Sequence, residues 1–222
     1  LRTDTANLNS QLVDLREKYE TMDANYAKLR SNSSNEINKL SADLKKREQR
    51  LNEVEEILRK RDAATNQLKA KLQDALLGFT KNGLTVEIKN GKVYVSLTDK
   101  LLFPSGSIII DEKGKQALTQ LATVLKQQPE INIAVEGHTD SQKINNLGQI
   151  KDNWDLSVLR ATSVVRFLTD EQKVESVRMT ATGKGQFQPL ADNTSAEGRS
   201  KNRRIEIVLS PKLDEMYDLI KQ

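Results

Sequence analysis

Glycine and proline are confined to one part of this chain, and that confinement limits what each part can fold into. All ten glycines lie at Gly78 or later, and all four prolines lie at Pro104 or later. Because both residues disrupt helix interiors, residues 1–77 can form one long helix, whereas the remaining residues carry the turn formers of a globular fold. We therefore expect two domains, a helical segment over residues 1–77 and a globular domain over residues 78–222.

Charge and composition exclude several kinds of protein. The 222 residues include 35 Lys and Arg against 31 Asp and Glu, but the two signs are mixed and form no long basic run, so we expect no nucleic-acid partner. The chain has no cysteine and a single histidine, His138, so we expect neither a metal nor a cofactor. No stretch approaches the roughly 18 consecutive apolar residues of a membrane span. Any attachment to a membrane is therefore expected through an anchor outside this chain.

Apolar residues recur along the helical segment with the alternating three- and four-residue gaps of a coiled coil. A first register consists of Leu8, Leu12, Leu15, Tyr19, Met22, Tyr26 and Leu29. A second register consists of Ile37, Leu40, Leu44, Leu51, Val54, Leu58, Leu68 and Leu72. The two registers are offset by a four-residue insertion, which locally relaxes a left-handed supercoil. We predict a coiled-coil stalk that forms a homo-oligomer and acts as a spacer.

The segment Ser31–Asn35 lies between the two registers and leaves the shape of the stalk open. Its serines and asparagines are poor helix formers, because their side chains compete for backbone hydrogen bonds, so the chain could reverse there into a helical hairpin. No Gly or Pro is present to enforce a reversal, and we predict a continuous rod. Another alternative is one amphipathic helix lying on its own globular domain. A helix of this length would reach roughly 115 Å, too far for such a domain to cover.

After Gly78 the apolar pattern changes from helical to alternating. Residues 84–88 and 93–97 alternate apolar and polar side chains around Asn90-Gly91, a sequence that favours a hairpin with a type I′ turn. Residues 101–103 continue the extended run. Asp111 is then expected to cap a helix that ends near Pro129.

Strands and helices alternate over the rest of the chain. We expect a buried strand over residues 131–137, a second helix opened by Asp155, strands over residues 177–182 and 204–209, and a short closing helix over residues 217–220. This order predicts an α+β fold, with helices packed on one face of a mixed β-sheet.

Four separated motifs carry the functional interpretation. They are Phe103–Gly106 (Phe-Pro-Ser-Gly), Val135–Asp140 (Val-Glu-Gly-His-Thr-Asp), Asn153–Ala161 (Asn-Trp-Asp-Leu-Ser-Val-Leu-Arg-Ala) and Asn202–Arg204 (Asn-Arg-Arg). In order and spacing they resemble the OmpA-like peptidoglycan-binding domain of Gram-negative bacteria, over about residues 83–209. The third motif resembles the version in flagellar stator proteins of the MotB type and in stalked envelope lipoproteins. The segment Ser141–Asp152 is longer than in porin-type members and is expected to be an insertion.

The resemblance implies a site for the diaminopimelate residue of the peptidoglycan stem peptide. In the family a strand-end aspartate and a helix arginine hold this residue, and they correspond to Asp140 and Arg160. A diaminopimelate centre offers an ammonium beside a carboxylate, which suits one fixed anion and one planar guanidinium. Without the motifs, a strand-end cap and an exposed helix charge would explain the two side chains. The resemblance extends the peptidoglycan-binding site to Thr139, Asn153, Leu156 and Arg203.

Three further residues in these motifs have competing interpretations. Neighbouring residues of a strand point to opposite faces, so only one of Arg203 and Arg204 can face the site, and we choose Arg203. His138 has no serine or cysteine nucleophile motif near it, so we expect local packing or hydrogen bonding rather than catalysis. Trp154 is interpreted as an anchor of the helix start rather than as a platform for a sugar.

The expected function is a non-enzymatic tether between the cell envelope and its peptidoglycan wall. The resemblance implies a periplasmic location, with a lipid or other anchor in the outer membrane. The alternative is a MotB-like stator subunit, which would hold a motor in the inner membrane to the wall. An enzyme such as a wall hydrolase would need a carboxylate pair or a metal site, and the motifs contain neither.

Overall fold

The computed structural model of the chain describes residues 2–144 and 150–211. It divides into two compact units, Leu1–Glu56 and Ile57–Gln222. The closing helix expected over residues 217–220 and part of the segment Ser141–Asp152 lie outside the described residues.

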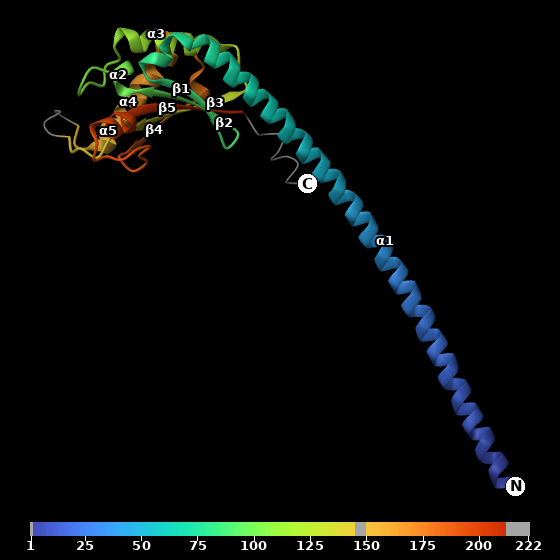
Figure 1. Cartoon of the computed structure of the whole chain (residues 1–222). Helices are drawn as coiled ribbons and strands as arrows, with labels where there is room; N and C mark the ends of the chain where they lie inside the picture. The colour runs from blue at the N-terminus through green and yellow to red at the C-terminus, as the bar shows by residue number, and fades with distance from the viewer. Residues whose placement is uncertain (1, 145–149, 212–222) are drawn as a thin grey trace. The chain divides into compact units, whose positions relative to one another are not determined.

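A single helix, α1 (Arg2–Ala75), makes up the N-terminal segment (Figure 1). It continues through Ser31–Asn35, so the reversal considered for this segment does not occur and the continuous helix is confirmed. Although α1 is long, neither it nor any other helix in the described part of the chain is apolar enough to cross a bilayer.

The last turns of α1 belong to the globular unit. Leu68, Leu72 and Leu76 are at most 3% exposed and form part of the hydrophobic core of that unit. Placing Leu68 and Leu72 in the coiled-coil seam is therefore wrong, because their side chains face the core of their own chain rather than a second helix. The compact globular unit, Ile57–Gln222, thus includes the last turns of α1.

The globular unit is built on a five-stranded mixed sheet with the order β1-β2-β5-β3-β4. The strands are β1 (Leu84–Lys89), β2 (Lys92–Thr98), β3 (Ile131–His138), β4 (Met179–Gly185) and β5 (Arg204–Pro211). Only β3 and β4 pair in parallel; the other neighbours are antiparallel. Asn90 and Gly91 join β1 to β2 with φ angles of 52° and 71°, the positive values that a type I′ turn requires.

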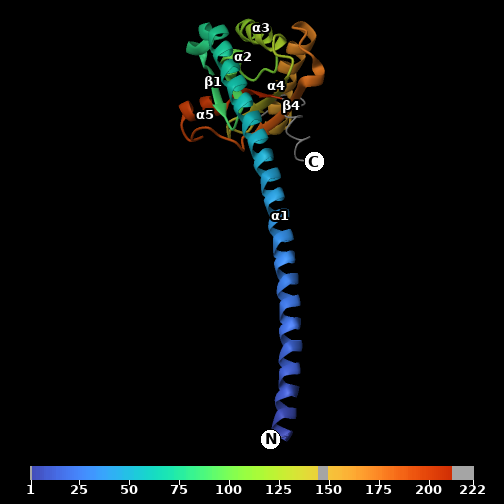
Figure 2. The ribbon, with the colours of Figure 1, turned by 90° about the vertical axis from the view of Figure 1, so that its right-hand side faces the viewer.

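Helices cover one face of this sheet. The helices after α1 are α2 (Asp99–Leu102), α3 (Glu112–Lys126), α4 (Asn153–Arg166) and α5 (Ala196–Asn202), with short turns η1 (Leu77–Asn82), η2 (Phe167–Glu171) and η3 (Ser176–Arg178). Among them, α3 and α4 bury apolar side chains against the sheet. Figure 2 shows the ribbon of these elements from a second side. The core consists of one cluster of apolar residues from α3, α4, the end of α1 and strands β2, β3 and β5. This arrangement confirms the predicted α+β fold with helices on one face of a mixed sheet.

The helix starts agree with the predictions in one case and differ in two. The Asp111 side chain accepts a hydrogen bond from Gly114 N at 2.8 Å and caps α3 as expected. The cap of α4 is Asp152 rather than Asp155, since the Asp152 carboxylate accepts hydrogen bonds from the first-turn amides. Residues expected to be extended after β2 form α2 instead, a single helical turn that buries Leu101 and Leu102.

Gly137 brings the start of α4 close to the end of β3. A Cβ atom at this position would lie 2.0 Å from the carbonyl oxygen of Ser157, so only glycine allows this approach. The residues that follow β3 therefore lie beside the first turns of α4, and this junction positions the candidate site.

Candidate functional site

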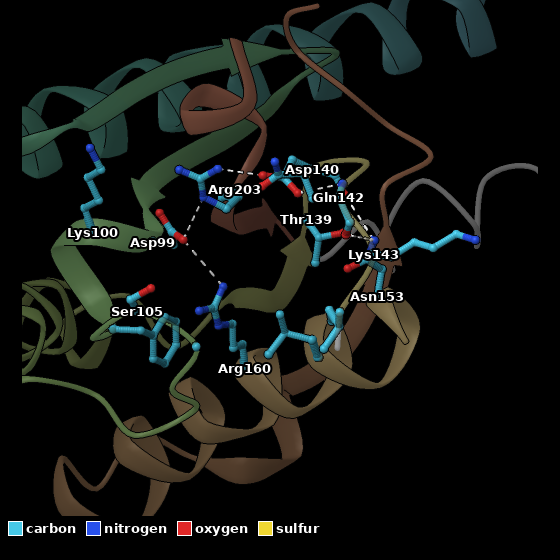
Figure 3. A pocket seen from close by; sticks show the side chains of 14 residues that line it. Asp99, Lys100, Ser105, Thr139, Asp140, Gln142, Lys143, Asn153, Arg160 and Arg203 are labelled. Atoms are coloured by element: carbon cyan, nitrogen blue, oxygen red, sulfur yellow. Dashed lines mark hydrogen bonds and ion pairs between the residues drawn. The ribbon is translucent and has the colours of Figure 1, made fainter. Parts of the chain in front are cut away.

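A cavity of about 550 Å³ opens where β3 ends and α4 begins. All the site residues predicted from the sequence line it, namely Thr139, Asp140, Asn153, Leu156, Arg160 and Arg203 (Figure 3). They come from three separate parts of the chain: the turn after β3, the first turns of α4 and the residue before β5. The fold thus brings together side chains that are far apart in sequence.

Carboxylates and guanidiniums alternate along one side of this cavity. Arg203 Nη1 lies 2.6 Å from Asp140 Oδ2, and Arg203 Nε lies 3.1 Å from Asp99 Oδ2. Arg160 Nη1 lies 3.7 Å from the same Asp99 oxygen. Figure 3 shows these ion pairs as a continuous row. The cavity therefore presents fixed groups of both signs to a ligand.

The Arg160 guanidinium is held in place by two neighbours. Its Nε donates a hydrogen bond to the Ser107 carbonyl oxygen at 3.0 Å, and its central carbon lies 4.9 Å from the centre of the Phe103 ring. Burial lowers the pKa of Arg160 below its ordinary value, while the Asp99 carboxylate acts in the opposite direction. Since Nε is engaged, an arriving carboxylate would meet the two Nη groups.

Asp140 is 5% exposed and is fixed from several sides. Its Oδ1 accepts a hydrogen bond from Gln142 N at 3.0 Å, while its backbone oxygen accepts one from Asn153 Nδ2 at 3.2 Å. The Asn153 amide also donates to Gln186 Oε1 at 2.9 Å. In this structure Asn153 therefore orders the loops around the cavity. Thr139 Oγ1 is buried and has no hydrogen-bond partner among the described residues.

Arg203 and Arg204 point to opposite faces of the sheet. Arg203 lines the cavity, whereas Arg204 Nε pairs with Glu206 Oε1 at 2.8 Å on the other face. Burial alone would lower the pKa of Arg203, but the hydrogen bond to Asp140 and the nearby charges of Asp99 and Asp140 raise it above its ordinary value. Arg203 thus stays fully charged in the cavity.

His138 lies on that other face as well. Its Nε2 is 3.5 Å from Glu206 Oε2 and 3.9 Å from Glu136 Oε2. Burial would raise the pKa of Glu206, but the nearby His138 imidazole and the pairing with Arg204 lower it to about 2. His138 therefore packs locally, as expected, and lies away from the cavity.

Glu136, His138 and Glu206 also form the one group of metal-ligating side chains found among the described residues, with ligand atoms within 4.8 Å of one another. Both carboxylates already have cationic partners, because Lys184 Nζ lies 3.5 Å from Glu136 Oε1 and Arg204 pairs with Glu206. A divalent cation would have to compete with these charges, so the group does not favour a metal site.

Sequence reasoning missed Asp99, which contacts both arginines of the cavity. The position of Asp99 in the site follows from the pairing of strands. Because β2 pairs antiparallel with β5, Thr98 lies opposite Arg204. The next residue, Asp99, donates its backbone N–H to the Arg203 carbonyl oxygen at 3.0 Å. Lys100 and Lys143 also line the cavity and were not predicted. The pairing of β2 with β5 is needed to find Asp99, and the sequence alone does not specify it.

The fold and the cavity together define a ligand-binding domain, in which paired charges at the strand ends face one opening. Residues 102–203 match the OmpA family. The chain therefore carries an OmpA family domain, and the resemblance based on the four motifs is confirmed.

Two curated relatives each match part of the chain. Motility protein B of Bacillus subtilis (strain 168) is 34% identical over 134 residues, which are 60% of this chain and 48% of the relative. The probable lipoprotein YiaD of Escherichia coli (strain K12) is 36% identical over 142 residues, 64% of this chain and 61% of the relative. The chain thus spans about half to three fifths of the length of these relatives.

A solved structure shares the fold. The cell wall anchor of the T6SS from Pseudomonas aeruginosa is 30% identical, with a TM-score of 0.58, and the match covers 64% of this chain and 97% of that one. The similarity therefore extends over nearly the whole of the solved chain of a protein described as a cell wall anchor.

Proposed function

We propose that this chain binds peptidoglycan without covalent chemistry, through the diaminopimelate residue of the stem peptide. The observation that carries the proposal is that Asp140 and Arg160, twenty positions apart in sequence, line one cavity with their charges fixed by neighbours. The family of the domain and the similarity to a cell wall anchor support the same conclusion.

The charges of the cavity suit the ends of diaminopimelate. Its ammonium would bind Asp140, whose carboxylate can accept further hydrogen bonds beside those of Arg203 and Gln142. Its carboxylate would bind the Nη groups of Arg160 in a bidentate pair. The lining contains more cationic than anionic side chains, with Lys100, Lys143, Arg160 and Arg203 against Asp99 and Asp140. This excess of positive charge suits a stem peptide that carries several carboxylates.

Calorimetric titration with two tripeptides tests the proposal. One ends in diaminopimelate, and the other has lysine in its place and so lacks the carboxylate that Arg160 would bind. We expect the lysine peptide to bind at least about tenfold more weakly, because it cannot form the charge-assisted hydrogen bonds to the Nη groups of Arg160. Equal affinity for the two peptides would rule out this mode of recognition.

For residues 2–56 of α1 we propose a role as spacer and oligomeriser. The apolar side chains of the first register, and those of the second up to Leu51, are between 50% and 69% exposed in the single chain: Leu8, Leu12, Leu15, Tyr19, Met22, Tyr26, Leu29, Ile37, Leu40, Leu44 and Leu51. A heptad seam of this length is stabilised when a second helix covers it. Two linked binding domains would also hold a polymeric wall far more firmly than one, by roughly a hundredfold or more.

The proposed location is the periplasm, with an anchor in the outer membrane, so that the chain tethers the envelope to the wall. The similarity to the probable lipoprotein YiaD supports this version. The similarity to Motility protein B supports the second candidate, a stator subunit held in the inner membrane. Deleting the gene in its own host separates the two, because loss of swimming with an intact envelope identifies the stator, whereas envelope defects in motile cells identify the tether.

We further propose that the chain is not an enzyme. The cavity combines charges that suit binding, and the buried histidine lies on the opposite face of the sheet. Incubating the protein with purified wall fragments tests this point, since release of soluble fragments would contradict it.

A further inference from the structure

A second cavity adjoins the one that contains Asp140 and Arg160. Its volume is about 420 Å³, and it shares Lys143, Ile144 and Asn153 with the first cavity. The other residues that line it are Ser141, Lys151, Asp152, Trp154, Gln186 and Phe187. A ligand bound in the first cavity could therefore extend into the second without leaving the protein surface.

Trp154 and Phe187 form an exposed aromatic pair in this second cavity. Their ring centres lie 5.1 Å apart with the planes inclined by 29°, and the two side chains are 49% and 62% exposed. By contrast, the core aromatic side chains Phe103 and Phe167 are each 4% exposed. An anchoring role at the helix start explains the position of Trp154 in the sequence but not its exposure, so a surface function has to be considered.

The backbone under Trp154 is fixed by hydrogen bonds on both sides. Its N–H donates to the capping Asp152 Oδ1 at 2.8 Å, and its carbonyl oxygen accepts from Ser157 Oγ at 2.9 Å. Ser157 Oγ in turn accepts from Gly185 N at 3.1 Å, which ties the first turn of α4 to the end of β4. The indole therefore stands on a rigid junction of helix and sheet.

The loop that carries Phe187 is tied to the same junction. Phe187 N donates to the Lys184 carbonyl oxygen at 3.3 Å, and the neighbouring Gln186 side chain accepts from Asn153 Nδ2 at 2.9 Å. Asn153 lines both cavities, so this bond joins the aromatic pair to the first cavity. A pair held in this way loses little conformational entropy when a ligand binds.

We propose that Trp154 and Phe187 form a platform for a sugar ring, namely a hexosamine of the glycan strand that carries the stem peptide. This inference rests on the proposed function. A pyranose has an apolar face of C–H groups and a rim of hydroxyl and acetamido groups. The stacked rings suit that face, and the surrounding amides and lysines suit the rim, as in other sites where a few polar groups orient a ligand on an aromatic surface.

The connectivity of peptidoglycan supports this choice of occupant. Diaminopimelate is the third residue of the stem, and two residues and a lactyl ether join it to the muramic acid ring. Two extended residues span roughly 7 Å, and the lactyl ether adds its own short length, so a sugar attached to a stem bound at Asp140 and Arg160 has to lie near that cavity. The adjoining cavity with its aromatic pair is such a place.

Two ligands test the platform on the full chain: the diaminopimelate tripeptide, and the same tripeptide attached to N-acetylmuramic acid. We expect the sugar-bearing ligand to bind about five- to tenfold more tightly, which corresponds to roughly 1 to 1.4 kcal/mol. Trp154 is the only tryptophan of the chain, so its fluorescence reports on the platform directly. The emission should change with the sugar-bearing ligand and stay nearly constant with the tripeptide.

Variants at the platform separate stacking from simple apolar contact. Trp154→Leu should remove the gain from the sugar and leave the tripeptide affinity unchanged, whereas Trp154→Tyr should keep most of it. Leu190→Ala is a matched control, because Leu190 is 55% exposed and lies in the same loop as Phe187 but outside both cavities. Unchanged tripeptide binding also shows that each variant is folded.

The outcomes distinguish this inference from the function on which it rests. One outcome is that the tripeptide binds while the sugar adds no affinity, and another is that the sugar adds the same affinity in Trp154→Leu as in the wild type. Either result would contradict the sugar platform and leave the proposed stem-peptide site intact. If neither ligand binds the wild-type chain, both proposals are wrong. If only the sugar-bearing ligand binds and Trp154→Leu abolishes its binding, the platform stands and the stem-peptide site is wrong.

Discussion

The Arg203 guanidinium lies 2.6 Å from the Asp140 carboxylate, so the predicted anion of the site is paired with a side chain of the protein itself. Arg203 also contacts Asp99, and it therefore holds two carboxylates in position at once. A ligand ammonium that binds Asp140 joins an existing ion pair, because a carboxylate accepts several hydrogen bonds. Arg203 thus both stabilises the fold and arranges the site.

Replacing Arg203 by alanine should lower the free energy of unfolding by about 1 to 3 kcal/mol, because Asp99 and Asp140 lose a charge-assisted partner in a largely buried place. Arg203 is itself partly exposed, which limits the effect. Urea unfolding measures it. The control is Lys201→Ala, which breaks an exposed pair with Glu197 and should leave the stability nearly unchanged. Equal effects of the two variants would contradict the structural role of Arg203.

Asp140→Ala and Arg160→Ala should each weaken binding of the diaminopimelate tripeptide by about 1.5 to 3 kcal/mol, since each removes a charge-assisted hydrogen bond to the ligand. Calorimetric titration gives the affinities. Arg166→Ala is the matched control, because Arg166 lies on the same helix, is exposed and is remote from the lining of the cavity. Unchanged affinity in both site variants would remove these residues from the site.

The sequence was sufficient for most of the fold because its signals are local. Asn90-Gly91 specifies a tight turn by its own backbone preferences, and Asp111 specifies a helix start by its side chain. Leu72 was misplaced because a buried leucine at helical spacing fits a heptad seam and a domain core equally well. The pattern shows that one side of a helix is covered, but not what covers it.

The difference between local signals and long-range contacts also decides which site residues can be predicted. Asp140 and Arg160 could be predicted because they belong to motifs, whereas Asp99 could not, since its contact with Arg203 joins residues 104 positions apart. That contact depends on which strands pair and in which register. The row of charges in the cavity therefore depends on the sheet topology. From the sequence alone, only those charged residues that belong to the motifs can be predicted.

The low pKa of Glu206, about 2, predicts a loss of stability in acid. The charged carboxylate is favoured in the folded state, so its contribution is fully present above the ordinary value of 4.5 and disappears as the pH falls through about 2. The contribution amounts to at most roughly 3 kcal/mol. Urea unfolding between pH 5 and pH 2 should show this loss in the wild type and a much flatter dependence in Glu206→Gln. Identical pH profiles would contradict the assignment.

The exposed seam of α1 predicts association through its first fifty residues. Replacing Leu15 and Leu44 together by glutamate should dissociate the oligomer, because each change places a charge in the interface between helices. Sedimentation velocity on the full chain gives the mass. Asp43→Ala is the control, since it removes an exposed pair with Arg47 but leaves every apolar residue of the seam in place. A wild-type chain that sediments as a monomer at high concentration would rule out the oligomeriser role.

The end of α1 predicts where the globular domain can be cut. A chain that begins at Gly78 lacks Leu68, Leu72 and Leu76, whose side chains fill the core, and each fully buried leucine contributes about 1.5 to 3 kcal/mol. This sum is comparable to the whole stability of an ordinary domain, so the shorter chain should be unfolded or molten, whereas a chain that begins at Ile57 should fold cooperatively.

Within the full chain, Leu72→Ala should lower the free energy of unfolding by about 2 to 5 kcal/mol. Leu44→Ala, at a position 69% exposed in the single chain, should leave the unfolding of the globular unit unchanged. The emission of Trp154 during urea unfolding follows that unit alone. A chain from Gly78 onward that unfolds with the same midpoint as the chain from Ile57 would show that the last turns of α1 lie on the domain without stabilising it.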